Sequence, residues 1–276
     1  MKNIKWYILT VAISLISWGI AYGWGILPAI SNTPGTNCTS GGNDSDTVLL
    51  IHSNTTDGSV TFVDSGQGAN CPHAPFTVTN DVHHETDQQK FGTTSIYFDG
   101  SDALSLPDHT DWDITTVNGN DDFGVGFWIR LDGIGAWKAV IGNGSGYISG
   151  TYSVGWGIVI YGGDTGHLAY FETDGGSLTY EYRVTPTLNA NTWYHIEVNQ
   201  VAPSVSVAIY VDGVAQAMVG ETGSQASRLS TDPLTFGREP ANASAYLAGY
   251  LDEIIIKKGV YLHNANFTPP AYAYCD

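Results

Sequence analysis

The chain has 276 residues, of which 10 are Lys or Arg and 27 are Asp or Glu, giving a formal net charge of −17 at pH 7. This charge repels the phosphates of nucleic acids and anionic lipid surfaces, so we expect no nucleic-acid partner. Aromatic residues make up 12% of the chain and Gly occupies 33 positions, a composition that favours twisted β-sheets with many tight turns.

The N-terminus is dominated by an uncharged apolar run at residues 6–30 that follows two lysines. As one apolar helix it is long enough to span a bilayer, and its aromatic residues gather at both ends as interfacial groups do. Small residues such as Ala21 and Gly23 also suit a signal peptidase. We therefore expect residues 1–30 to be a membrane anchor or a cleaved signal peptide, and either would export the remaining chain.

Residues 31–46 contain Gly, Ser, Thr, Asn and Asp without an apolar run. Such a composition predicts a flexible stalk between the apolar segment and a folded domain. Six Asn-x-Ser/Thr sequons fit an exported, glycosylated protein; they lie at Asn37, Asn43, Asn54, Asn143, Asn242 and Asn266.

Downstream of the stalk, short runs of aromatic and β-branched residues recur, and helical periodicity is nearly absent. Residues 204–211 show the alternation of a strand with one buried face, and Asp57-Gly58 predicts the turn of a first hairpin. The pattern predicts an all-β fold of two antiparallel sheets. We expect strands at Thr47–Ser53, Ser59–Asp64, Phe76–Asn80, Ser95–Asp99, Ala103–Leu106, Phe123–Leu131, Trp137–Gly142, Gly155–Tyr161, His167–Thr173, Ser177–Val184, Trp193–Val201, Ser204–Val211, Leu234–Gly237 and Ala248–Lys257.

Nine segments, in this order, resemble the laminin G-like, concanavalin A-like jelly-roll domains of exported bacterial, archaeal and viral surface proteins. The segments are Val48–His52, Lys90–Gly100, Leu104–Asp108, Phe123–Arg130, Thr192–His195, Ile209–Gly213, Leu234–Arg238, Gly249–Glu253 and Asn266–Pro270. The resemblance implies an antiparallel two-sheet jelly-roll sandwich over residues 47–276. Domains of this kind serve as carbohydrate-binding modules, adhesion modules and structural decorations.

The resemblance also implies a structural Ca²⁺ where the first and last strands meet. Asp252 would be the main ligand, because Ca²⁺ prefers carboxylate and carbonyl oxygens; the alternative is that Asp252 caps a turn or pairs with Arg238. Relatives often carry an acidic residue near the position of Asn54, so a neutral ligand there would weaken the site. The residues similar to the family's site are Asp252, Asn54, Asp57 and Asp99.

The chain has three cysteines: Cys38, Cys71 and Cys275. One disulfide and one odd thiol is the simplest arrangement. A bond between Cys38 and Cys275 would join the two ends of the domain, which commonly meet in jelly rolls. Pairing of either residue with Cys71 stays open at this point.

Catalytic patterns are weak. Laminarinase-type hydrolases of this fold carry two glutamates and an aspartate at alternate positions on one strand, facing one cleft. Glu172 and Asp174 begin that spacing, but Gly175-Gly176-Ser177 follows and the second glutamate is missing; Glu181 lies on a later strand. We therefore expect no enzyme, with a glycoside hydrolase as the less favoured alternative.

The histidines have structural explanations. Adjacent residues of a strand point to opposite faces, so His83 and His84 would share a metal only within a loop. We expect His83-His84-Glu85 to be a surface loop without a metal. His52 and His195 lie within apolar runs and are expected to be hydrogen-bonded core or edge residues.

Aromatic residues outside the core pattern are the stronger functional signal. Sugars present C–H faces that stack on aromatic rings, while their hydroxyls meet polar side chains. We expect Trp137, Tyr147 and Tyr152 to be exposed and to bind glycan. The function predicted is a non-catalytic extracellular or cell-surface adhesion module that recognises a carbohydrate or a surface glycoprotein. The alternative is a self-associating structural subunit of a cell-surface layer, filament or virion.

Overall fold

The computed structural model describes residues 38–39, 42–114, 121–162, 166–185, 188–201, 207–223, 229–241 and 245–276. The apolar run at residues 6–30 and the sequons at Asn37 and Asn242 lie outside the described residues. The strands are β1 (Thr47–Ile51), β2 (Thr77–Thr79), β3 (His83–Glu85), β4 (Ser95–Asp99), β5 (Ala103–Leu106), β6 (Phe123–Leu131), β7 (Lys138–Gly142), β8 (Val154–Ile160), β9 (Leu168–Asp174), β10 (Leu178–Val184), β11 (Trp193–Gln200), β12 (Val207–Val211), β13 (Val214–Ala215), β14 (Met218–Gly223), β15 (Leu234–Phe236) and β16 (Ala248–Lys258), with one short 3₁₀ helix, η1 (Thr110–Trp112).

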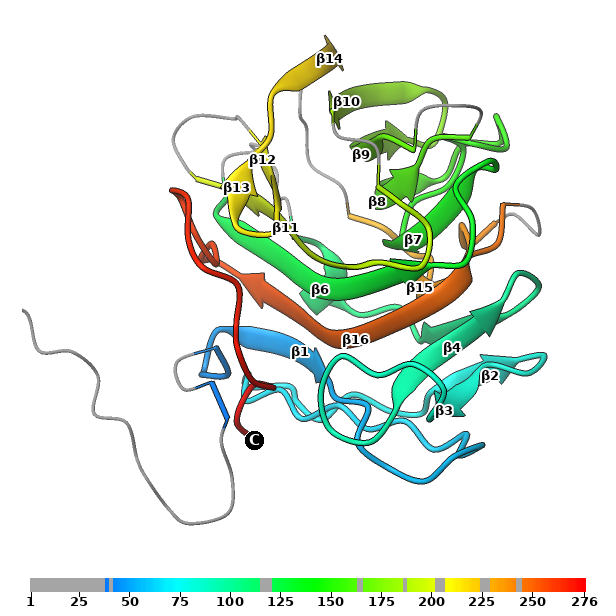
Figure 1. The fold of residues 1–276 in the computed structure, drawn as a ribbon. Helices are drawn as coiled ribbons and strands as arrows, with labels where there is room; N and C mark the ends of the chain where they lie inside the picture. The colour runs from blue at the N-terminus through cyan, green and yellow to red at the C-terminus, as the bar shows by residue number, and fades with distance from the viewer. Residues whose placement is uncertain are drawn as a thin grey trace, which may run out of the picture. The chain divides into compact units, whose positions relative to one another are not determined.

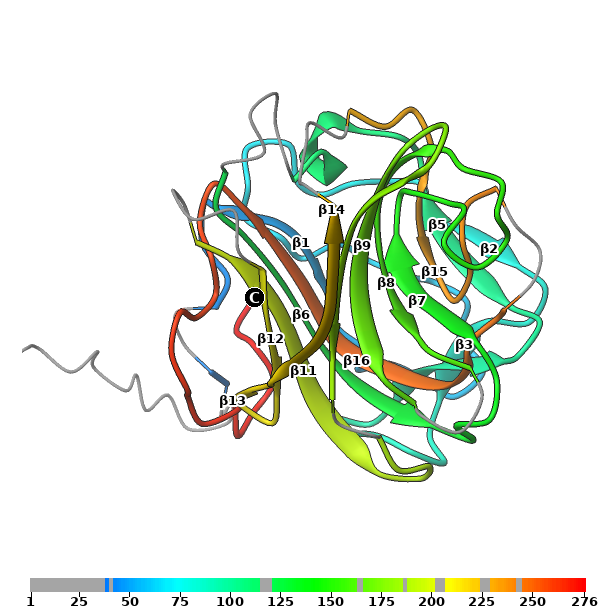
Figure 2. The same cartoon turned by 90° about the horizontal axis from the view of Figure 1, so that it is seen from above.

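These strands form two eight-stranded sheets (Figures 1 and 2). The first sheet has the order β13-β12-β11-β6-β16-β4-β3, with β1 paired to the second half of β16. The second sheet has the order β14-β10-β9-β8-β7-β15-β5-β2. Neighbouring named strands all pair antiparallel. The expected all-β antiparallel two-sheet sandwich is therefore confirmed.

The apolar core lies between the two sheets and follows from the alternation of their strands. On β6, residues Phe123, Val125, Phe127, Ile129 and Leu131 all belong to the core cluster, because side chains two apart on a strand share a face. Trp156 and Ile158 enter the same core from β8. The largest fully buried side chains include Trp112, Trp156, Tyr170, Tyr180 and Phe98.

Part of the outer face of the first sheet is covered by the C-terminal segment, residues 259–276, which is drawn in red in Figure 1. Leu262 packs onto β6 at two glycines. A Cβ at Gly124 would lie 2.8 Å from Leu262 Cγ, and one at Gly126 would lie 3.0 Å from Leu262 Cδ1. The two glycines inside an otherwise bulky strand thus make room for this segment.

The two ends of the folded unit are joined. The predicted disulfide between Cys38 and Cys275 is present, and Thr39 forms a parallel bridge with Tyr274. Within the predicted stalk, Asp44 accepts a charge-assisted hydrogen bond of 2.6 Å from Lys257 Nζ. The described residues from 42 to 46 therefore contact the sandwich directly.

The predicted first hairpin is wrong. β1 pairs with β16, and the described residues 59–64 contain no strand. The Asp57-Gly58 turn instead bonds to the third strand, with Gly58 N–H donating to His84 O at 2.8 Å and His84 N–H donating to Ser59 O at 2.8 Å. Pairing with β16 buries all five residues of β1, which a hairpin alone would leave half exposed.

The predicted surface loop at His83-His84-Glu85 is also wrong, because these residues form β3 and pair with β4. His84 is buried, stacks on Phe62 with ring centres 4.5 Å apart and hydrogen-bonds Ser53 Oγ at 2.6 Å. Burial lowers the pKa of His84, which keeps the imidazole neutral.

No helix among the described residues is long and apolar enough to cross a membrane.

Candidate functional site

Five side chains gather on the outer face of the second sheet, and we call them the aromatic patch: Trp137, Tyr147, Tyr161, Glu181 and Arg183. The first precedes β7, the second comes from the loop at residues 143–153, the third follows β8, and the last two lie on β10. On β10 the register pairs Glu181 with Phe171 and Arg183 with Ala169. Phe171 and Ala169 belong to a small apolar cluster separate from the main core, so these positions face outward.

The three rings of the aromatic patch are in mutual contact. The ring centres of Trp137 and Tyr161 are 4.2 Å apart, and those of Trp137 and Tyr147 are 5.9 Å apart. Tyr147 also stacks on Phe171, at 4.9 Å with 14° between the ring planes. The result is a continuous aromatic surface on one side of the sheet.

Polar groups run along the same surface. The hydroxyls of Tyr147 and Tyr161 are hydrogen-bonded to each other, and the Tyr161 hydroxyl donates to Glu181 Oε1 at 2.8 Å. The Arg183 guanidinium lies 4.7 Å from the centre of the Tyr161 ring and 3.6 Å from Glu181 Oε1. Burial, together with the Glu181 carboxylate, raises the pKa of both tyrosines, so their hydroxyls stay protonated at neutral pH.

Two glycines position the rings. A Cβ at Gly162 would lie 2.3 Å from Trp137 Cδ1, and a Cβ at Gly157 would lie 2.5 Å from the Phe171 ring. Any larger residue at either position would push its ring away from the sheet. The close approach of Trp137 and Phe171 is thus built into the sequence of β8 and its following turn.

The loop at residues 143–153 is held by a buried carboxylate. Glu239 accepts hydrogen bonds from the backbone N–H of Gly146 at 3.3 Å and of Ile148 at 2.9 Å. Both donors flank Tyr147, so Glu239 fixes the ring that covers Phe171. A small cavity lined by Gly157, Phe171 and Glu239, among others, lies under this loop.

The predicted glycan-binding residues lie in this region, but all three are half-buried. Trp137 and Tyr147 come together in the aromatic patch. Tyr152 packs against the backbone of Gly146, where an added Cβ would lie 2.4 Å from its ring. Sequence reasoning did not select Tyr161, although the alternation of β8, with Trp156 facing the core, places Tyr161 on the opposite face.

The two glutamates considered for a hydrolase, Glu172 and Glu181, lie on opposite faces of the second sheet. Glu172 is fully buried, pairs with Tyr180 across the ladder and accepts a hydrogen bond of 3.0 Å from the Tyr170 hydroxyl. Glu181 is the next residue along β10 after Tyr180 and therefore points the other way. Asp174 accepts from the backbone N–H groups of the turn that follows it.

The predicted Ca²⁺ ligands each bind groups of the protein. Asp252 is fully buried and accepts from the backbone N–H groups of residues 90, 91 and 253. Asn54 accepts from Thr93, and Asp57 from Thr86. Asp99 Oδ1 accepts from the Ser101 N–H and hydroxyl. Ca²⁺ binding stays a prediction, which a rise in melting temperature on adding Ca²⁺ would support and an unchanged melting temperature would contradict.

The sequons differ in their surroundings. Asn143 is fully buried and its Nδ2 donates to Trp112 O at 3.3 Å. Asn43 Nδ2 donates to Ser65 O at 2.9 Å and to Cys275 O at 3.2 Å. Asn54 and Asn266 are exposed, so their side chains are open to modification.

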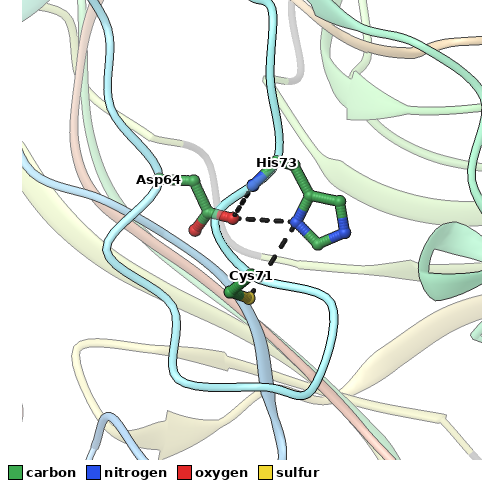
Figure 3. Close-up of side chains that lie close together, drawn as sticks. All are labelled: Asp64, Cys71 and His73. Carbon is green, nitrogen blue, oxygen red and sulfur yellow. Dashed lines mark hydrogen bonds and ion pairs between the residues drawn. The ribbon is translucent and has the colours of Figure 1, made fainter.

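A second group of polar residues, which the sequence analysis missed, surrounds His73. Its Nδ1 lies 2.8 Å from Asp64 Oδ2 and its Nε2 lies 3.0 Å from Asp111 Oδ2; Figure 3 shows the first of these contacts. His109 Nδ1 lies 3.4 Å from the same Asp111 oxygen. We call His73, His109, Asp111 and Asp64 the histidine cluster.

The histidine cluster borders an open pocket of about 220 Å³. The pocket lies between the loop around residues 70–74 and the segment that enters η1. Its lining residues are Asn70, Pro72, His73, Ala74, Leu106, Pro107, Asp108 and His109. Among the described residues, the groups of three or more His, Cys, Asp or Glu with metal-ligand spacing are Asp64, Cys71 and His73, and His73, His109 and Asp111.

Cys71 is free and lies beside His73, as Figure 3 shows, with Sγ 3.9 Å from Nδ1. Burial, followed by the charge of Asp64, raises the pKa of this thiol to about 12. Cys71 is therefore a neutral thiol at physiological pH. A nucleophile or a thiolate ligand needs the opposite shift.

The chain is similar to one protein family in sequence and to several solved structures in fold. A family model of the concanavalin A-like lectin/glucanases superfamily, laminin G type, matches residues 98–260, more than half of the chain. Comparison of the sequence with curated proteins gives no significant match.

Solved structures share this fold at low identity. Domain 4 of AbnA, a GH43 extracellular arabinanase from Geobacillus stearothermophilus, in complex with arabinotriose, is 15% identical with a TM-score of 0.50, covering 78% of this chain and 94% of that one. The binding domain of botulinum neurotoxin serotype G is 12% identical with a TM-score of 0.53, covering 79% of this chain and 48% of that one. A structure of botulinum neurotoxin type C is 16% identical with a TM-score of 0.51, covering 78% of this chain and 48% of that one. Its description states that cell entry of this toxin depends on interaction with two ganglioside molecules. This chain thus spans about half of the neurotoxin chains.

Proposed function

The chain belongs to the concanavalin A-like lectin/glucanases superfamily, and we propose that it is a non-catalytic, extracellular binding module that recognises glycans through the aromatic patch. The observation that carries this proposal is the contact of Trp137 with Tyr161, at 4.2 Å between ring centres, beside the Glu181 carboxylate and the Arg183 guanidinium. Rings provide stacking surfaces for sugar C–H groups, and the two charged groups provide a donor and an acceptor for hydroxyls.

The position of the aromatic patch supports the same function. Residues 259–276 of the chain itself cover the part of the first sheet's outer face around Gly124, Gly126 and Ile255. Among the described residues, the loop at residues 143–153 and the segment 238–240 pack on the outer face of the second sheet, and Trp137 and Tyr161 remain half-buried there. Two of the structural neighbours are also described with saccharide ligands, arabinotriose and gangliosides.

The arrangement of carboxylates supports a module without hydrolase activity. A retaining or inverting glycosidase needs two carboxyl groups on either side of one bond. Glu172 faces Tyr180 in the buried side of the second sheet, whereas Glu181 faces outward. The Tyr161 hydroxyl donates a hydrogen bond to Glu181, and the Arg183 guanidinium forms an ion pair with it. These contacts suit a Glu181 carboxylate that accepts hydrogen bonds from a ligand.

We propose that the module acts outside the cytoplasm. The Cys38–Cys275 disulfide supports this location, because disulfides persist in oxidising compartments. Export through residues 1–30, as an anchor or as a cleaved signal, belongs to the same proposal. Mass spectrometry of the protein from its native source would report cleavage and glycosylation together.

Glycan-array binding of the wild-type protein and two variants tests the proposal. Trp137→Ala should reduce binding at least tenfold, because it removes the ring that contacts both Tyr147 and Tyr161. Trp193→Ala is the matched control, since Trp193 is a half-buried tryptophan on the first sheet, in contact with Tyr250. Equal binding by all three proteins would overturn the aromatic patch as the site.

The same experiment separates the alternative function. A structural subunit of a cell-surface layer, filament or virion would show no glycan binding in any variant, and the protein would occur in regular arrays in native particles. That pair of results would replace the proposed function.

A further inference from the structure

We propose that the histidine cluster is a binding site for a divalent transition-metal ion, with Zn²⁺ as the ion of best fit and with His73, His109 and Asp111 as ligands. Two imidazoles and one carboxylate form a donor set that suits Zn²⁺ and neighbouring transition metals rather than Ca²⁺. This inference is independent of glycan binding by the aromatic patch.

The donor atoms already have the spacing that such an ion requires. Zn–N and Zn–O bonds of about 2.0–2.1 Å in a tetrahedron place neighbouring donor atoms about 3.3 Å apart. Asp111 Oδ2 lies 3.0 Å from His73 Nε2 and 3.4 Å from His109 Nδ1. All three donor atoms lie within 4.8 Å of one another, so small side-chain movements would complete the coordination.

Outer contacts hold the ligands as they do in known metal sites. Asp64 accepts from His73 Nδ1 at 2.8 Å, and a carboxylate on the far nitrogen is the usual partner of a metal-binding histidine because it fixes the ring and its tautomer. Asp64 is itself held by the N–H groups of Leu50 and Gly66. Asn70 Nδ2 contacts both oxygens of Asp111 at 3.1 Å.

The cluster combines burial with access. The side chain of His73 is 8% exposed and that of Asp111 is 11% exposed, while that of His109 is 37% exposed. His73 and His109 both line the open pocket. Three protein ligands beside an open pocket leave a fourth position for water or an anionic ligand, as in metal sites that bind exchangeable groups.

Each ligand has a contact that the ion would replace. His109 Nδ1 now accepts from the Asp111 N–H at 3.2 Å, and His73 Nε2 faces Asp111 Oδ2 as a hydrogen-bonding partner. Without an ion, His73 would bridge Asp64 and Asp111 as an imidazolium and tie the loop at residues 70–74 to η1. The competing role is therefore a purely structural ion pair.

Calorimetric titration of the full chain, without a polyhistidine tag, with ZnSO₄ separates the two roles. The metal site predicts one equivalent of Zn²⁺ bound with a Kd of micromolar or below, and absorption bands of four-coordinate Co²⁺ when CoCl₂ is used instead. A structural ion pair predicts no saturable binding. Wild-type protein that binds no Zn²⁺ up to 100 µM would overturn the proposal.

His109→Asn is the diagnostic variant, because Asn is a favoured residue at the start of a helix and preserves the cap of η1 while removing the imidazole nitrogen. We expect its Zn²⁺ affinity to fall at least 100-fold with an unchanged melting temperature of the metal-free protein. His83→Ala is the matched control, since His83 is a partly exposed histidine on β3 next to Glu85. A similar loss in both variants, or in neither, would contradict the assignment.

Discussion

The outer faces of the two sheets are built from similar strands but are covered by different segments of the chain. On the first sheet, the C-terminal segment covers the glycines of β6 and buries Leu50 and Ile255 together with Tyr274. On the second sheet, the loop at residues 143–153 covers Phe171 and leaves the aromatic patch at its border. The aromatic patch on the second sheet is the surface that we propose to bind glycan.

Buried glutamates help to hold both covering segments in place, and on the first sheet Glu197 also contacts His263 at 3.0 Å. Glu253 accepts from Tyr274 N–H at 2.7 Å and contacts His52 Nδ1 at 2.7 Å. Glu239 accepts from the N–H groups of Gly146 and Ile148. Glu253 has a histidine partner as well as one backbone donor, whereas Glu239 has two backbone donors, so the two glutamates should differ in their contribution to stability and in its response to pH.

The largest effect is expected from Glu253→Ala. This variant removes the buried carboxylate beside His52, which keeps only the exposed Asp276, and leaves the buried Tyr274 N–H without an acceptor. The expected cost is about 3–5 kcal/mol of unfolding free energy. Urea denaturation followed by fluorescence measures the loss. Glycan binding by the remaining folded protein should be unchanged, because the aromatic patch lies on the other sheet.

Glu253→Gln is the control for this variant. It retains an acceptor for the Tyr274 N–H and removes only the charge, so its loss should be smaller than that of Glu253→Ala. Loss of glycan binding in Glu253→Ala would show that the two outer faces are coupled, which would contradict their separate roles.

A smaller effect is expected from Glu239→Ala. The N–H groups of Gly146 and Ile148 lose their acceptor, which lowers the unfolding free energy by about 2–3 kcal/mol. Here glycan binding should fall as well, because Tyr147 lies between the two donors. Isothermal titration with the best array ligand measures the second effect, and unchanged affinity would mean that Tyr147 contributes nothing to binding.

The strands were largely predictable because each is specified by a local pattern. β6, β9 and β16 follow from runs of aromatic and β-branched residues, and they appear near their predicted bounds. The partner of β1 was not predictable: a turn signal at Asp57-Gly58 describes only local geometry, whereas burial of both faces of β1 depends on β16, some 200 residues away. The strand at His83–Glu85 was missed for the same reason, since its pairing with β4 is what buries His84.

The two candidate sites also differ in how far local sequence patterns predict them. Trp137 and Tyr147 were accessible to sequence reasoning because they lie in turns beside strands of clear alternation. The histidine cluster was not, because Asp64 and His73 lie in the long connection between β1 and β2, Asp111 lies in η1, and these segments meet only through tertiary contacts. The short spacing of His109 and Asp111 was the one local signal that could have indicated it.

The smallest effect is a pH dependence of stability that arises from His52 and Glu253 at the first sheet. Glycan binding at the second sheet should lack it. Burial lowers the pKa of His52, but the hydrogen bond and charge of Glu253 and the charge of Asp276 outweigh it and raise the pKa above its ordinary value. A raised pKa in the folded state means that the folded protein binds a proton more tightly than the unfolded chain, whose histidines titrate near pH 6.5. The stabilisation is therefore complete below about pH 6.5 and is lost as the pH rises through the raised pKa of His52. His52→Gln should remove this part of the decline in urea midpoints measured between pH 6 and 9, while His73 and His83 remain unchanged in both proteins.

Glycan binding should stay constant over pH 6 to 8, because the pKa values of the phenols in the aromatic patch are raised above their ordinary value. A decline in urea midpoints that is identical in wild type and His52→Gln would contradict the role of the His52–Glu253 pair in holding the C-terminal segment.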